Sequence, residues 1–246
     1  SKIEIVRLGL AAMETFNIGQ VPPITFGVGR LRKLPDLMSA LGGGPVLVIA
    51  DAILAEIGAT EKLIHQLSEK GIPVEIAAEV LGEPKEALVD ALCERARLTG
   101  AKAVIGLGGG ATMDAAKLVA ALAPCNQPAH TFALAAQPLP KNGLPAIAIP
   151  TTAGTGSEVT RTSVISKTDG SKIWFWGEQL MFSQAILDPE LTLSLPSHLT
   201  AWTGIDAVAH ALEGCTATNT SPAGSMYGLE ALRILTDALP GAVADG

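Results

Sequence analysis

The sequence predicts an α/β fold in which a parallel, Rossmann-like sheet (residues 1–187) is followed by the start of an all-helical domain (residues 188–246). Short, unbroken apolar runs are typical of strands that are buried on both faces of a parallel sheet. Helical segments alternate with these runs, as β-α-β units require. After Asp188-Pro189 the strand-like runs stop, which places the domain boundary there.

Five apolar runs are the expected strands, at residues 24–28, 46–50, 74–77, 103–107 and 146–149. The first helix presents residues 63, 64 and 67 on one face and stops at Gly71. A second helix is expected from Pro84 to Gly100, and a third follows the glycines after residue 107.

Later segments have their own signals. Residues 124–145 contain five prolines and are expected to form a long surface excursion. Thr168-Asp169-Gly170 predicts the turn of a small hairpin. Ser197 is expected to cap a helix over about 199–213, and residues 223–239 predict another helix.

Composition limits the function classes. Hydrophobic residues make up 48% of the chain, enough for a large core. The net charge of −7 and the absence of Lys/Arg runs argue against nucleic acid and anionic membranes as partners. No stretch approaches the roughly 20 apolar residues of a membrane span, and the N-terminal residues lack the core of a signal peptide. Three widely spaced cysteines fit a reducing compartment, so we expect a cytoplasmic protein.

A glycine turn, Gly106-Leu107-Gly108-Gly109-Gly110-Ala111, joins an apolar run to a helix. Consecutive glycines let backbone N–H groups approach a pyrophosphate, and a helix N-terminus adds its positive dipole end. The pattern matches a dinucleotide fingerprint, but no acidic residue follows about 20 positions later, so an ordinary Rossmann unit is not expected. The alternative is a tight connection that binds no ligand.

Two further features suit the same cofactor. Asp51 follows the run 46–50, where its carboxylate could bind ribose hydroxyls and repel a 2′-phosphate, favouring NAD over NADP. The alternative role for Asp51 is an N-cap. The segment Pro150–Glu158 is rich in threonine and glycine and could wrap a phosphate or a carboxamide. Alternatively, its hydroxyls satisfy the loop itself.

Asp206 and His210 form a candidate metal pair. Residues at i and i+4 share one helix face, with Cβ atoms about 5–6 Å apart, which suits two ligands of one divalent ion. Mononuclear catalytic sites normally use three protein ligands, and no other histidine is a convincing third. The alternative is a surface aspartate and a packed histidine.

These motifs, in this order, resemble the iron-containing (group III) alcohol dehydrogenase family. Its Gly-Gly-Gly-Ser-x-x-Asp-x-x-Lys element is similar to Gly108–Lys117, with Ala111 in place of the serine. Its Pro-Thr-Thr-x-Gly-Thr-x-x-Glu-Val-Thr element is similar to Pro150–Thr160. The segments Asp188–Thr192 and Thr203–Glu213 match its Asp-Pro-x-Leu-Thr element and its metal-binding helix.

The resemblance implies the dehydroquinate synthase-like fold and a set of site residues. The residues expected to line an NAD site are Asp51, Gly108, Gly109, Gly110, Asp114, Thr151, Thr152, Thr155 and Lys172. Asp206 and His210 would be catalytic as ligands of Fe²⁺, with Zn²⁺ as an alternative. The family's other two ligands are histidines on later helices, so the chain is expected to be truncated, corresponding to the first two-thirds of the family.

The implied function is hydride transfer between an alcohol or aldehyde and NAD, with the metal as Lewis acid. Two alternatives stay open: a maleylacetate reductase or dehydroquinate synthase-like enzyme of the same fold, or an inactive NAD-binding fragment. The Asp188 and Asp206 elements favour the alcohol dehydrogenase. The expected partners are a small-molecule substrate and further copies of the chain, in a homodimer or larger oligomer.

Overall fold

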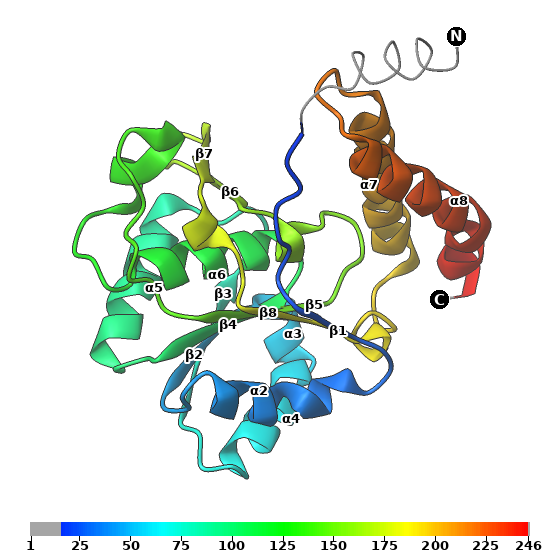
Figure 1. The fold of residues 1–246 in the computed structure, drawn as a ribbon. Coiled ribbons are helices and arrows are strands. Elements are labelled where there is room, and N and C mark those ends of the chain that lie inside the picture. The colour runs from blue at the N-terminus through cyan, green and yellow to red at the C-terminus, as the bar shows by residue number, and fades with distance from the viewer. Residues whose placement is uncertain (1–15, 246) are drawn as a thin grey trace, which may run out of the picture.

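The computed structural model describes residues 16–245, which form a sheet covered by helices on both faces and a pair of long helices beside it (Figure 1). The expectation about a signal peptide concerns the first residues of the chain, which lie outside this range. Among the described residues, no helix has the length and apolar character needed to cross a bilayer.

The sheet has six parallel strands in the order β1-β8-β5-β4-β2-β3. The strands are β1 Ile24–Phe26, β2 Val46–Asp51, β3 Val74–Val80, β4 Ala103–Gly108, β5 Ala146–Pro150 and β8 Gln184–Leu187. All five predicted strands are confirmed. β8 was not predicted, because its four residues begin with a polar side chain and are too few to show a pattern.

The strand order marks one edge of the sheet as a candidate ligand site, because the order of the strands reverses between β2 and β4. From β2 it moves outward to β3, then returns to β4 and continues through β5 to β8. In open parallel sheets, ligands bind outside the carboxyl ends of the strands at such a reversal. Apart from β1, which lies at the far edge beyond β8, the strands follow the order β3-β2-β4-β5-β8. This is the 2-1-3-4-5 order of doubly wound sheets and differs from the dinucleotide-binding order 3-2-1-4-5-6, because only one strand lies beyond β2.

Helices cover both faces of the sheet (Figure 1). On one face lie α2 Leu34–Ala40, α3 Ala52–Glu56 and α4 Ala59–Ser68; on the other lie α5 Glu86–Leu98 and α6 Gly110–Leu122. Short 3₁₀ helices are η1 Arg30–Lys33, η2 Ala129–Ala135, η3 Ser157–Val159, η4 Glu178–Leu180 and η5 Pro189–Leu191. The helix predicted from Pro84 begins two residues later because Lys85 keeps an extended backbone.

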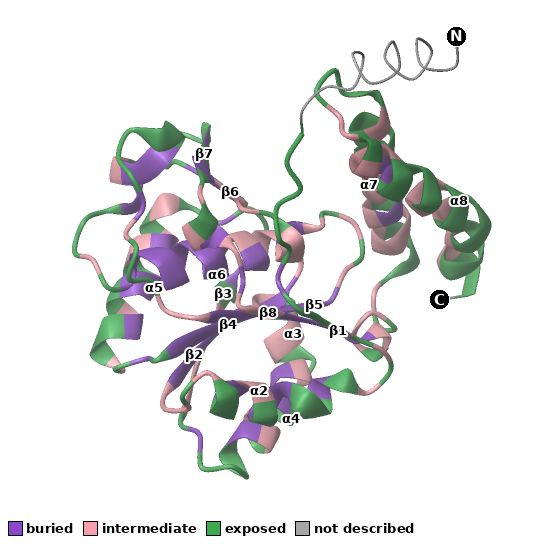
Figure 2. Ribbon diagram, viewed as in Figure 1, coloured by how far each residue is buried: buried purple, intermediate pink, exposed green. Residues whose placement is uncertain are grey.

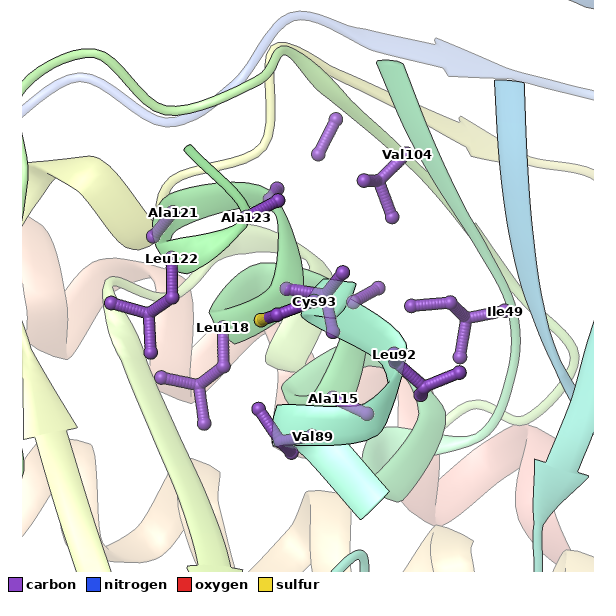
Figure 3. Packing of buried hydrophobic residues seen from close by; sticks show 14 of the residues in the cluster. Ile49, Val89, Leu92, Cys93, Val104, Ala115, Leu118, Ala121, Leu122 and Ala123 are labelled. Carbon is purple, nitrogen blue, oxygen red and sulfur yellow. The ribbon is translucent and has the colours of Figure 1, made fainter. Parts of the chain in front are cut away.

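Two apolar cores lie on the two faces of the sheet. Alternate residues of β2 point to opposite cores, with Leu47 and Ile49 packing on the α5–α6 side and Val46 and Val48 on the other. Figure 3 shows the α5–α6 core, in which Leu92 of α5 lies beside Ile49 of the sheet and Leu118 lies on the side of α6 away from the sheet. The helix that carries the glycine turn is therefore fixed along its length.

The proline-rich excursion, residues 124–145, corrects one expectation. It was predicted to be a surface loop, but Phe132 and Leu139 are buried in the α5–α6 core. Asp90 of α5 also accepts a hydrogen bond from the Ala129 N–H. The prolines break regular structure, but the apolar side chains between them still complete the core.

The predicted hairpin is confirmed. β6 Thr162–Ser166 and β7 Lys172–Trp176 pair antiparallel, and Gly170 takes a positive φ of 83° in the turn. Ile165 and Phe175 are fully buried in the same core as α6. The hairpin therefore stands over α6 and adds a wall beyond the carboxyl ends of the strands.

After β8 the chain is helical, as predicted: none of the described residues beyond Leu187 lies in a strand. α7 Ser197–Thr216 and α8 Pro222–Asp245 pack on each other through small residues. A Cβ atom placed on Gly228 would lie 2.8 Å from the Ala211 carbonyl oxygen. Figure 2 shows mostly exposed and intermediate residues along both helices, in contrast to the sheet.

The predicted cap of α7 is wrong. Ser197 lies inside the helix, and the residue before it, Pro196, is the N-cap with an extended backbone (φ −57°, ψ 144°). Proline fixes φ near −65°, which suits the entry to a helix. No side chain accepts a hydrogen bond at this cap.

Candidate active-site cleft

The predicted motifs meet at the carboxyl edge of the sheet, where the chain reverses between β2 and β4. Strand register pairs Gly108 at the end of β4 with Pro150 at the end of β5. The Thr151 N–H donates to the Gly108 carbonyl oxygen at 2.9 Å. Asp51 ends β2, the strand on the other side of β4. The glycine turn therefore lies between the aspartate and the threonine-rich loop.

The glycine turn has no room for a side chain at Gly108 or Gly110. Gly108 has a φ of 155°, and a Cβ atom there would lie 2.5 Å from the Thr112 hydroxyl oxygen. A Cβ atom on Gly110 would lie 2.7 Å from the Thr155 methyl carbon. The N-cap of α6, Gly109, provides no side-chain cap. The first N–H groups of α6 are therefore left for a ligand, which is the arrangement that binds phosphate at helix N-termini.

A cleft of about 590 Å³ opens beside this turn. Five of the residues predicted for the site line it: Gly110, Asp114, Thr155, Lys172 and His210. They come from α6, the threonine-rich loop, β7 and α7, so the cleft lies between the sheet domain and the long helices. This placement fits a dinucleotide whose phosphates meet α6 and whose other end extends toward His210.

The remaining predicted residues lie around the cleft. Thr152 lines a smaller pocket of about 210 Å³ at the ends of β5 and β8. Thr151 is buried, and its N–H group holds the loop to β4. Gly108 and Gly109 form the turn itself. Asp51 and Asp206 do not line the cleft.

Asp51 acts as a helix cap in the structure. Its Oδ1 atom accepts the Ile53 N–H at 3.0 Å at the start of α3. Asp51 is therefore the N-cap of α3, and this role uses one of its two carboxylate oxygens.

Asp114 is held by the protein on both oxygens. Its Oδ1 accepts the Ser157 hydroxyl at 2.5 Å and its Oδ2 accepts the Val164 N–H at 2.9 Å. Burial raises the pKa of Asp114, although the nearby Lys117 opposes this shift. Asp114 therefore borders the cleft while it joins α6 to η3 and β6.

Lys172 and Glu83 form an ion pair in the lining of the cleft. The Lys172 Nζ lies 3.3 Å from a Glu83 carboxylate oxygen, and both residues line the cleft. Lys172 is more than half exposed. Glu83 was not recognised in the sequence, where a single glutamate after a strand carries no signal.

The metal pair is on α7. The Asp206 Oδ2 and the His210 Nδ1 are 3.7 Å apart, and both side chains are about half exposed. His210 is therefore not a packed core histidine. A carboxylate oxygen and an imidazole nitrogen suit Fe²⁺ or Zn²⁺, so the pair fits part of such a site. Within residues 16–245, no group of three or more His, Cys, Asp or Glu residues could hold a metal.

Comparison with known proteins identifies the family. Residues 22–189 match the family model described as iron-containing alcohol dehydrogenase. The chain belongs to this family. The match confirms the resemblance that the motifs predicted.

Relatives of this iron-containing alcohol dehydrogenase chain match nearly all of it. Long-chain-alcohol dehydrogenase 1 of Geobacillus thermodenitrificans is 38% identical over 92% of the chain and 58% of its own length. The probable alcohol dehydrogenase EutG of Escherichia coli is 38% identical over 97% of the chain and 60% of its own. The chain thus spans about three-fifths of these relatives.

Solved structures agree on the fold. The crystal structure of sulfoacetaldehyde reductase from Bifidobacterium kashiwanohense in complex with NAD⁺ has a TM-score of 0.90 and 31% identity, over 95% of this chain and 62% of that one. An iron-containing alcohol dehydrogenase from Thermotoga maritima has a TM-score of 0.86 and 32% identity, over 94% and 64%. The predicted fold class is therefore confirmed.

In this family member, Gly154 of the threonine-rich loop lies directly against α7. A Cβ atom there would lie 2.5 Å from the Thr203 carbonyl oxygen, which is backbone and cannot rotate away. The Gly154→Ala variant is therefore expected to lose about 1–3 kcal/mol of unfolding free energy, measured by urea denaturation. Gly214→Ala on α7 is the control, since its Cβ atom meets nothing within 4 Å. Equal stability of the two variants would contradict a close contact at Gly154.

Proposed function

We propose that this chain forms the cofactor domain and part of the metal domain of an NAD-dependent alcohol dehydrogenase, with the boundary between residues 187 and 188. The enzyme transfers hydride between an alcohol or aldehyde and NAD. One observation carries the proposal: a single cleft is bordered by the uncapped start of α6 at Gly110 and by His210 of the metal pair.

The cofactor is proposed to lie along the carboxyl edge of the sheet. Its pyrophosphate meets the first N–H groups of α6, where backbone donors and the helix dipole favour negative charge. The adenosine ribose extends toward Asp51 on the neighbouring strand β2. The nicotinamide half enters the cleft, where Thr155 and Lys172 supply polar contacts. The structural neighbour in complex with NAD⁺ supports this choice of cofactor.

Asp206 and His210 are proposed to hold Fe²⁺, with Zn²⁺ as the alternative. When bound, such a metal supplies Lewis-acid stabilisation for the oxygen of an alcohol or aldehyde. His210 presents its side chain at the cleft wall, and Asp206 accompanies it one turn earlier on α7. The pair would therefore hold the substrate oxygen at α7, beside the cleft proposed for the cofactor.

The relatives favour an alcohol or aldehyde as substrate. Their names include a long-chain-alcohol dehydrogenase, a sulfoacetaldehyde reductase and a methanol dehydrogenase described as NAD-dependent. These names favour alcohol chemistry over a maleylacetate reductase or a dehydroquinate synthase.

We also propose a homo-oligomeric, cytoplasmic enzyme. Phe26 is 70% exposed on β1 at the edge of the sheet, and Val28 follows it at 67%. Exposed apolar residues at a sheet edge are typical of protein contacts. The free cysteines Cys93, Cys125 and Cys215 are consistent with a reducing compartment.

The choice of NAD is tested at Asp51. The Asp51→Asn variant keeps the ability to cap α3 but loses the negative charge. NAD is expected to bind about tenfold more weakly, and NADP more tightly than in the wild type, because the repulsion of a 2′-phosphate is gone. Calorimetric titration with both cofactors measures this change.

The stability of Asp51→Asn serves as the control, because asparagine caps about as well as aspartate. An unchanged preference for NAD in a stable variant would show that Asp51 is only a cap. An Asp51→Ala variant, which loses both cap and charge, separates the two contributions.

A further inference from the structure

We propose that Lys117 is a positioning residue for the cofactor: its ammonium group fixes α6, the threonine-rich loop and the β6–β7 hairpin in the arrangement that binds phosphate. The inference rests on the proposed function and goes beyond it by assigning a role to a residue that does not line the cleft.

Lys117 is held by three acceptors that match its three N–H donors. Its side chain is fully buried, and Nζ donates to the Ser157 hydroxyl at 2.8 Å, the Thr160 hydroxyl at 2.9 Å and the Thr162 carbonyl at 2.7 Å. An ammonium group has three donors and no acceptor, so the charged form satisfies every contact. A neutral amine has two N–H groups and would leave one acceptor unpaired.

These contacts tie together the walls of the cleft. Lys117 is on α6, two turns after Gly110. Ser157 lies in the threonine-rich loop and Thr160 follows it, and Thr162 begins the hairpin that carries Lys172. The Ser157 hydroxyl in turn donates a hydrogen bond to Asp114, whose carboxylate lies 3.5 Å from the Lys117 Nζ. The three predicted cofactor elements are therefore joined behind the cleft by one buried group.

Burial and the neighbouring carboxylates act in opposite directions on the pKa of Lys117. Burial lowers the pKa of Lys117 to about 8, and the opposite charges of Asp114 and Glu158 only partly offset this. The groups that face Nζ are Asp114 on α6, Glu158 on η3 and the Phe182 ring, 5.8 Å away, before β8. From β6 it meets the Thr162 carbonyl. Any added negative charge nearby therefore favours protonation.

A ligand carrying phosphates is expected to draw a proton onto Lys117 at alkaline pH. At pH 6.5 the amine is already charged, so binding takes up less than about 0.1 proton. At pH 8.5 about a quarter of the free protein is charged, so binding takes up as much as about 0.7 proton. ADP-ribose is the best probe, because it keeps both phosphates and lacks the positive nicotinamide ring.

The experiment is calorimetric titration of the protein with ADP-ribose at both pH values, in buffers of different ionisation enthalpy. The wild type is expected to show proton uptake at pH 8.5 only. Lys117→Arg stays charged and is expected to show none. Lys117→Met cannot donate hydrogen bonds and is expected to bind at least tenfold more weakly at both pH values.

The matched control is Leu118→Ala, at the next position on α6. Leu118 is fully buried in the α5–α6 core, so its truncation destabilises the same helix without touching the lysine contacts. Leu118→Ala is expected to melt earlier but to bind ADP-ribose within twofold of the wild type. Amide hydrogen exchange over residues 157–164 should accelerate in Lys117→Met and not in Leu118→Ala.

The outcomes separate the two proposals. If the wild type does not bind ADP-ribose at all, the cofactor site itself is wrong, and the role of Lys117 falls with it. If ADP-ribose binds and Lys117→Met loses no more affinity than Leu118→Ala, only the inference about Lys117 is overturned. A loss of affinity in Lys117→Met alone supports the positioning role whether or not protons are taken up at pH 8.5.

Discussion

The Gly110→Val variant is expected to lose about two to three orders of magnitude in NAD affinity, or about 3–4 kcal/mol of binding free energy. A Cβ atom at this position would lie 2.7 Å from the Thr155 methyl carbon and 2.8 Å from its hydroxyl oxygen. The branched side chain must therefore push the threonine-rich loop away or fill the space in front of the α6 N–H groups. Either result removes the close backbone approach that a pyrophosphate needs.

Fluorescence titration with NADH measures this loss. The control is Gly241→Val on α8, where a Cβ atom meets nothing within 4 Å. Valine is no worse than glycine in an exposed helix, so this variant should bind NADH like the wild type. NADH affinity that survives in Gly110→Val would place the phosphates somewhere other than the start of α6.

The sequence predicted the central strands because their environment leaves a simple pattern. β2, β4 and β5 are buried on both faces, so their residues are almost uniformly apolar. β8 is too short for such a pattern. Residues 124–145 were wrongly predicted to lie on the surface, because their five prolines indicated a loop although Phe132 is buried in the core. Local signals therefore describe the sheet well and the segments packed on it less well.

The glycine turn and the threonine-rich loop could be predicted from the sequence, but the hydrogen bonds that connect them through Lys117 could not. Three glycines before a helix and a threonine-rich loop after a strand are local features with a direct physical meaning. The contacts of Lys117 link it to residues 40 to 45 positions away, and no sequence period reports such pairings. The one available signal is a lysine within the apolar run Ala115–Leu122, which indicates a buried charge with a fixed partner.

The His210→Ala variant is expected to lose bound iron and at least about three orders of magnitude in turnover, or roughly 4 kcal/mol of transition-state stabilisation. Its fold should be preserved, because the side chain is half exposed and surface changes usually cost within about 0.5 kcal/mol. Metal analysis and NADH formation from an alcohol, both on the whole enzyme, measure the two losses. Removing the metal from the wild type with a chelator should cause the same loss of turnover. Added Fe²⁺ should restore turnover in the chelated wild type but not in His210→Ala.

His198→Ala is the matched control, since His198 lies on the same helix but packs edge-on against Trp202 and does not line the cleft. The decisive comparison is with Gly110→Val, because the metal pair and the glycine turn belong to different helices, α7 and α6. His210→Ala should keep NADH affinity and lose iron, whereas Gly110→Val should keep iron and lose NADH affinity. If His210→Ala keeps both its iron and its turnover, His210 is not a ligand of the catalytic metal, and the assignment of the metal pair is wrong.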